Sequence, residues 1–165
     1  MYLKLLLLFL PFSLLANELE DYLKQYVGRW VGEFTIHSSA TNYRETFPVE
    51  QRYWWEGGQL HGLSVSDTDR GMRTAKSRSY IINGVLRSTV TEEGSIKEYI
   101  GTLHDGGLVW LSVDLQRAND YQIKEYFVES GIQRRLHSDG FDTYVFQEGL
   151  GHLVYRGRLA HTPAK

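Results

Sequence analysis

The fold of this chain is set by one stretch near its start, Gly28-Arg29-Trp30-Val31-Gly32-Glu33-Phe34-Thr35-Ile36. Every second residue in it is apolar or glycine, and most of the residues between them are polar or charged. A period of two predicts a β-strand with one buried face and one solvated face. Gly28 and Gly32 permit the close backbone approach that a small barrel needs where it closes. Trp30 is then predicted to plug one end of that barrel.

Strands and short turns fill the rest of the chain. Polar or glycine-rich turns are predicted at 38–42, 57–58 and 67–71. From Gly84 onward, turn signals recur every 9 to 14 residues: Asn83-Gly84, Glu93-Gly94, Asp105-Gly106-Gly107, Asn119-Asp120, Ser130-Gly131, Asp139-Gly140 and Glu148-Gly149-Leu150-Gly151. This spacing, with no helical segment between the turns, predicts an all-β fold, an antiparallel up-and-down β-barrel of about ten strands. Pro48 interrupts the long strand 43–56, so a bulge, a bend or an unpaired edge is expected there.

A single short helix is predicted before the first strand, over residues 17–27. Its apolar residues fall on one face at helical spacing: Leu19, Tyr22, Leu23, Tyr26 and Val27. Asn17 is suited to cap the helix, and Gly28 to end it. Such a helix, placed directly before the first strand, is expected to cover one mouth of the barrel.

The first sixteen residues have the pattern of a secretory signal peptide: Lys4, an apolar run over 5–10, and the small residue Ala16. The apolar run is shorter than the ~20 residues that span a bilayer. We therefore expect cleavage after Ala16, a single domain over residues 17–165, and a periplasmic or secreted location. An N-terminal anchor helix is the alternative. No later segment is apolar enough to predict a transmembrane span.

Composition narrows the function classes. The chain has 165 residues, no cysteine and a net charge of −2, so its stability does not depend on disulfides. The weak charge argues against nucleic acid or an anionic membrane as the main partner. Nothing in the sequence specifies an oligomeric state.

The leader, the short helix, the Gly28-Arg29-Trp30 motif and the meander of hairpins together resemble the calycin superfamily, in particular bacterial lipocalin-like and fatty-acid-binding-like barrels. The resemblance implies a barrel that holds a small apolar or amphipathic ligand. It also implies that an arginine near the last strand packs over Trp30, and Arg156 or Arg158 is expected to do so. Haem-binding barrels similar to nitrobindin share the Gly-x-Trp-x-Gly strand, and His152 would be the matching ligand; their other elements are not recognisable, so no cofactor is predicted.

No catalytic motif is recognisable, and the six histidines lack metal-ligand spacing. We therefore predict no metal site and no catalytic residue. His61 is the best chemical candidate, as the acid or base of a barrel enzyme. An ordinary hydrogen-bonded strand histidine is the alternative.

The predicted ligand site combines aromatic side chains with a few polar groups: Trp30, Tyr53, Trp55, His61, Arg87 and Trp110. Arg87 would anchor an acidic head group if its strand face points inward, and sequence parity leaves that open. Three functions follow: a non-enzymatic carrier of a small ligand, a barrel enzyme using His61, and a structural or interaction module. In the third, eleven tyrosines, seven phenylalanines and four tryptophans fill the interior.

Overall fold

Ten antiparallel strands form a closed barrel in this computed structural model, which describes residues 10–113, 122–146 and 149–163. The strands are β1 (Gly28–Ser38), β2 (Arg44–Glu56), β3 (Gln59–Thr68), β4 (Gly71–Ile82), β5 (Val85–Glu92), β6 (Ser95–His104), β7 (Gly107–Ser112), β8 (Gln122–Ser130), β9 (Gln133–Phe146) and β10 (Gly149–Thr162). Each strand pairs with its neighbours in sequence, and β1 pairs with β10 to close the barrel. The predicted all-β, up-and-down barrel is confirmed.

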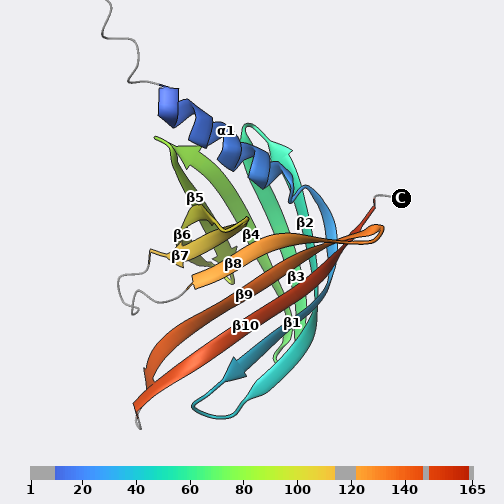
Figure 1. Ribbon diagram of the computed structural model, residues 1–165. Helices are drawn as coiled ribbons and strands as arrows, with labels where there is room; N and C mark the ends of the chain where they lie inside the picture. The colour runs from blue at the N-terminus through green and yellow to red at the C-terminus, as the bar shows by residue number, and fades with distance from the viewer. Residues whose placement is uncertain (1–9, 114–121, 147–148, 164–165) are drawn as a thin grey trace, which may run out of the picture.

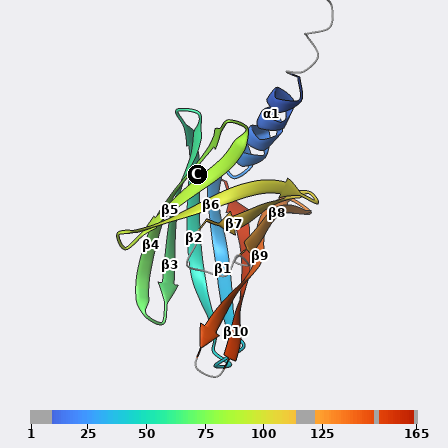
Figure 2. The ribbon, with the colours of Figure 1, turned by 90° about the vertical axis from the view of Figure 1, so that its left-hand side faces the viewer.

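Helix α1 (Leu10–Lys24) lies across one end of the barrel, and the turn joining β1 to β2 lies at the other end (Figures 1 and 2). We call these the helix-covered end and the polar mouth. The polar mouth is formed by the turns near residues 39–43, 69–70 and 93–94. The helix starts earlier than predicted and stops at Lys24, and Gly28 opens β1 with a φ of 132°. None of the described helices is long and apolar enough to cross a bilayer.

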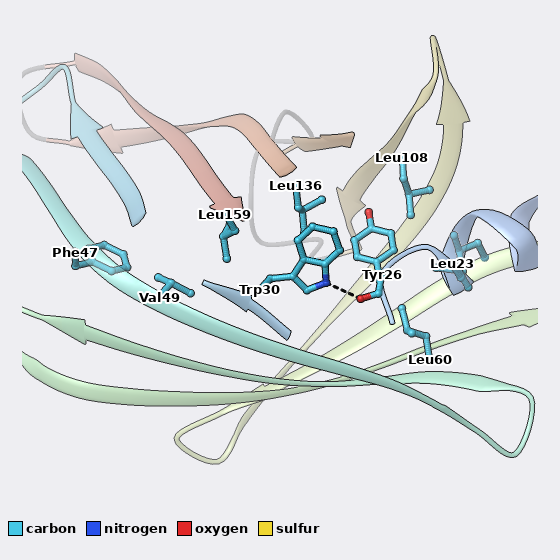
Figure 3. Close-up of a cluster of buried hydrophobic side chains, with 10 residues drawn as sticks. Leu23, Tyr26, Trp30, Phe47, Val49, Leu60, Leu108, Leu136 and Leu159 are labelled. Atoms are coloured by element: carbon cyan, nitrogen blue, oxygen red, sulfur yellow. Dashed lines mark hydrogen bonds between the residues drawn. The ribbon is translucent and has the colours of Figure 1, made fainter. Parts of the chain in front are cut away.

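The core extends from Leu23 on the helix along the barrel interior to Val49 and Phe47 on β2 (Figure 3). Leu23 and Tyr26 are 1% and 2% exposed, and Trp30 is fully buried. The Trp30 indole N–H donates to the Tyr26 carbonyl oxygen at 2.6 Å, which joins the end of the helix segment to the first strand. The prediction that the helix covers one mouth is therefore confirmed.

Glycines allow the backbone to close around these side chains. A Cβ at Gly32 would collide with the Arg158 carbonyl oxygen on β10, so the predicted close approach at the barrel seam is confirmed. Asp139-Gly140, predicted as a turn, lies inside β9 instead. A Cβ at Gly140 would lie 2.6 Å from Ile123 Cγ1, so this glycine serves close packing against β8.

Pro48 sits in the regular β1–β2 pairing, opposite Glu33, but β3 pairs with β2 only from Val49 onward. Pro48 therefore lies where β2 has no partner on β3, which agrees with the expected unpaired edge. The Asn119-Asp120 turn signal lies outside the described residues.

Candidate ligand-binding cavity

The barrel interior contains a cavity of about 240 Å³ beneath the helix-covered end. Ten strands and one helix leave this space because several inward positions carry serine or glycine rather than large apolar residues. The lining residues come from α1, the segment after it, and strands β2 to β8: Leu23, Tyr26, Tyr53, Leu60, Ser77, Ser79, Ser88, Val90, Tyr99, Trp110, Ile123 and Glu125. We call this the inner cavity. Its mixed wall of aromatic, aliphatic and hydroxyl groups is typical of a small-molecule site.

Glu125 supplies the only charged side chain among the described residues of that wall. Its Oε2 accepts hydrogen bonds from the Tyr26 hydroxyl at 2.9 Å and the Trp110 indole N–H at 3.0 Å. Its Oε1 accepts from the Ser138 hydroxyl at 3.1 Å. Burial raises the pKa of Glu125, and these three donors partly offset that shift.

A serine wall lies on β4 and β5: Ser77, Ser79 and Ser88. Ser79 and Ser88 are buried, and the Ser79 hydroxyl donates to Ser88 Oγ at 3.0 Å. Aromatic side chains complete the wall of the inner cavity: Tyr26, Tyr53, Tyr99 and Trp110. A Cβ at Gly101 would lie 2.8 Å from Trp110 Cζ3, so the absence of a side chain there lets the indole pack closely against β6.

A second cavity of about 910 Å³ occupies the polar mouth. Four acidic and three basic side chains are among the residues lining it: Glu45, Asp69, Glu92, Glu98, Arg70, Arg73 and Lys97. Arg73 and Lys97 both approach Glu92, at 3.7 and 3.8 Å. Tyr99 lines both cavities, so they adjoin at this side chain.

Tyr53 and Trp110 line the inner cavity, where the predicted ligand site would place them. Trp55 packs against the core nearby, and the Lys24 ammonium lies 5.5 Å from its ring centre. Trp30 packs below the inner cavity without lining it. The structure thus brings Tyr53 and Trp110 together around one space and leaves Trp30 and Trp55 as core residues beside it.

The arginine expected over Trp30 is not Arg156 or Arg158. Both of these reach Asp139 instead, with N–O distances of 3.6 Å for Arg156 and 2.7 Å for Arg158. Trp30 packs against the rings of Phe127 and His161, with centroid distances of 5.6 and 4.9 Å.

The cation at this end comes from β9. The Arg134 guanidinium lies 4.4 Å from the Phe127 ring centre and donates to Gln25 Oε1 at 2.6 Å. The alternation of side chains along β10 explains why neither Arg156 nor Arg158 packs over Trp30 as expected. Leu159 and His161 point inward, so Arg156 and Arg158 point outward.

Arg87 and His61 lie on the outer face of the barrel. Leu86 and Ser88 are the buried neighbours of Arg87, so the arginine side chain points away from the inner cavity. His61 stacks on Trp54 at 5.6 Å, and Trp54 is 40% exposed. Neither residue lines the inner cavity, and a catalytic role of His61 inside the barrel therefore has no geometric basis.

His152 is exposed on β10, and its Nδ1 lies 3.0 Å from the Thr143 hydroxyl. It points away from the interior. Among the described residues, no group of three or more histidine, aspartate or glutamate side chains is arranged to hold a metal ion.

Glu125 was not singled out from the sequence, although a signal for it exists. Ile123, Glu125 and Phe127 share one face of β8, so a carboxylate stands between two apolar residues on a face that must be buried. Its three hydrogen-bond partners come from segments 15, 13 and 99 residues away in sequence, which no local pattern links to it.

Comparison with known proteins supports the fold. No family model matches the chain, and no curated protein matches it. One similar solved structure is an S-type phycobiliprotein lyase, CPES, from Guillardia theta. It is 10% identical, with a TM-score of 0.59 over 89% of this chain and 94% of that chain. At this identity the likeness shows a shared β-barrel fold.

Proposed function

We propose that this protein binds a small apolar or amphipathic molecule inside the barrel, without chemical conversion. The observation that carries the proposal is the pair of adjoining cavities, about 240 and 910 Å³, inside one closed sheet. Small-molecule sites generally measure about 300–1,000 Å³. The space fits a ligand whose mainly apolar body lies in the inner cavity and whose other end extends toward the polar mouth.

Chemical contrast between the two cavities supports an amphipathic ligand. The inner cavity has Tyr53, Leu60 and Trp110 in its wall, whereas charged side chains of both signs surround the polar mouth. Burial of apolar ligand surface supplies the affinity, at roughly 25 cal/mol per Å². A barrel filled by its own aromatic side chains would leave no such space. The fold neighbour, a phycobiliprotein lyase, is consistent with a barrel that handles a ligand.

Titration with N-phenyl-1-naphthylamine, whose emission rises in apolar sites, tests the proposal. We expect a saturable emission increase with the wild type. Val90→Trp, which places an indole in the inner cavity, should weaken binding by about tenfold or more. Thr91→Trp is the matched control, because Thr91 is the next residue of β5 and is exposed on the opposite face. Emission that does not saturate, or equal affinities of the two variants, would refute binding in the inner cavity.

We further propose that the protein is exported. The support is the sequence of residues 1–16, with its lysine, apolar run and terminal Ala16. Cleavage after Ala16 would retain Tyr22 and Leu23, the helix side chains that pack on the barrel. Mass spectrometry of the protein from cell fractions should find a chain starting at Asn17 outside the cytoplasm. A cytoplasmic chain starting at Met1 would contradict export.

A further inference from the structure

Among the described residues, three donors reach the Glu125 side chain, and Glu125 lines the inner cavity. An ionised carboxylate offers about four acceptor positions. Three are occupied: two at Oε2, by Tyr26 and Trp110, and one at Oε1, by Ser138. Because Glu125 lines the inner cavity, a ligand placed there can donate to a further acceptor position at Oε1.

The charge around this position discriminates between ligands. No lysine or arginine is among the described side chains that line the inner cavity. Arg87, which could have neutralised an acidic head group, lies on the outer face. A ligand carboxylate beside Glu125 would thus meet a like charge in a region of low dielectric, which is strongly unfavourable.

The rest of the wall favours a positively charged or N–H-bearing group. Tyr26, Tyr53 and Trp110 present aromatic rings to the same space, and aromatic faces attract cations. The serine wall across the inner cavity offers hydroxyl oxygens as further acceptors. Apart from the Trp110 indole N–H, which donates to Glu125, the polar side chains described in this wall can accept a hydrogen bond from a ligand.

We propose that Glu125 is the specificity-determining anchor of the inner cavity and selects ligands that carry an amine or another N–H donor on an apolar body. The inference rests on the proposed function, because it requires that a ligand enters the barrel. It narrows the ligand class to N–H donors such as amines and disfavours fatty acids. The N–H of the ligand donates to Glu125 Oε1, and its apolar part packs against Leu60, Val90 and Ile123.

Isothermal titration calorimetry with octylamine, octanol and octanoic acid tests the inference, since the three probes share one chain. A charge-assisted hydrogen bond favours its ligand by about tenfold or more over a neutral one. We therefore expect octylamine to bind at least about tenfold more tightly than octanol, and octanoic acid to bind most weakly. Equal affinities, or tighter binding of octanoic acid, would overturn the role of Glu125 and leave the proposed carrier function intact.

Glu125→Gln gives the second measurement. Its amide oxygen can accept from Tyr26 and Trp110 while its NH₂ group donates to Ser138, so the variant keeps the shape and hydrogen bonds of the site. The preference for octylamine over octanol should fall to within about threefold. Glu33→Gln, on the outer face of β1, should retain the full preference. A full preference in Glu125→Gln would also overturn the inference, and absence of binding by all three probes to the wild type would overturn both proposals.

Discussion

The two ends of this barrel are built from different side chains. At the helix-covered end, Leu23 of α1 packs with Tyr26 and Trp30, and these three residues are at most 2% exposed. At the polar mouth, Ile96 is 67% exposed and charged side chains line a cavity of about 910 Å³. The same ten strands thus carry one end with a packed core around a small inner cavity and one end with a larger cavity lined by charged side chains. Stability and ligand access are therefore located at opposite ends of one sheet.

This division has a physical cause. Burying apolar side chains is the main source of folding free energy, so a barrel that keeps a hollow must pack tightly elsewhere. Phe127 contacts Tyr22, Tyr26 and Trp30 through their rings, with centroid distances of 5.0 to 5.6 Å. Substitutions should therefore affect stability strongly at the helix-covered end and weakly at the polar mouth.

Trp30→Ala should produce the largest effect and tests the packed end directly. Removing a fully buried tryptophan lowers the free energy of unfolding by about 3–5 kcal/mol, through lost burial and the cavity left behind. Urea denaturation followed by circular dichroism measures this change. Trp54→Ala is the matched control, because Trp54 is 40% exposed on the outer face. A loss below about 1 kcal/mol for Trp30→Ala would contradict its role as the plug.

Arg134→Ala comes next and separates an inner arginine from the outer ones. Arg134 packs on Phe127 and donates to Gln25, so its removal should lower the free energy of unfolding by about 1–3 kcal/mol. Arg158→Ala, which loses a partly exposed pair with Asp139, should lower it by less than about 1 kcal/mol. Equal losses in denaturation experiments would mean that Arg134 adds nothing beyond a surface ion pair.

Glu125→Gln should change the pH dependence of stability. The pKa of Glu125 is raised above its ordinary value of 4.5, so the folded state holds this proton more tightly than the unfolded state. The stability that this proton provides is complete below about pH 4.5 and is lost as the pH rises through the folded pKa. Relative to Glu125→Gln, the wild type should therefore lose stability over that range. Thermal melts of both proteins from pH 4 to pH 8 measure the difference, and parallel curves would contradict the raised pKa.

Arg73→Gln at the polar mouth should have the smallest effect. Arg73 lies 3.7 Å from Glu92 and 3.9 Å from Glu93, both in partly exposed pairs. Such pairs contribute about 0–1 kcal/mol and are screened by salt. Urea denaturation at low and high salt should give nearly the same free energy of unfolding for wild type and variant. A loss above about 2 kcal/mol would show that the polar mouth is also a stability element.

Part of the candidate site could be predicted because strand alternation is local. Tyr53 shares a face with Val49, and Trp110 shares a face with Leu108, so their burial follows from neighbours two or four residues away. Arg87 could not be oriented in the same way, because polar residues occupy both faces of its strand. Inward serines at 79 and 88 read as solvent-facing residues until the sheet closes around them.

The sequence by itself determined the strands, most of the hairpins, the covering helix and the burial of Trp30, because periodicity and turn chemistry act over a few residues. Only the tertiary structure decided which arginine meets the aromatic cluster, which face of β5 points inward, and that Glu125 stands in the inner cavity. These outcomes depend on closure of β1 against β10 and on contacts between residues far apart in sequence, such as Arg134 and Gln25, which are 109 residues apart. Local patterns specify which strands form, but the register around the closed sheet specifies which side chains meet.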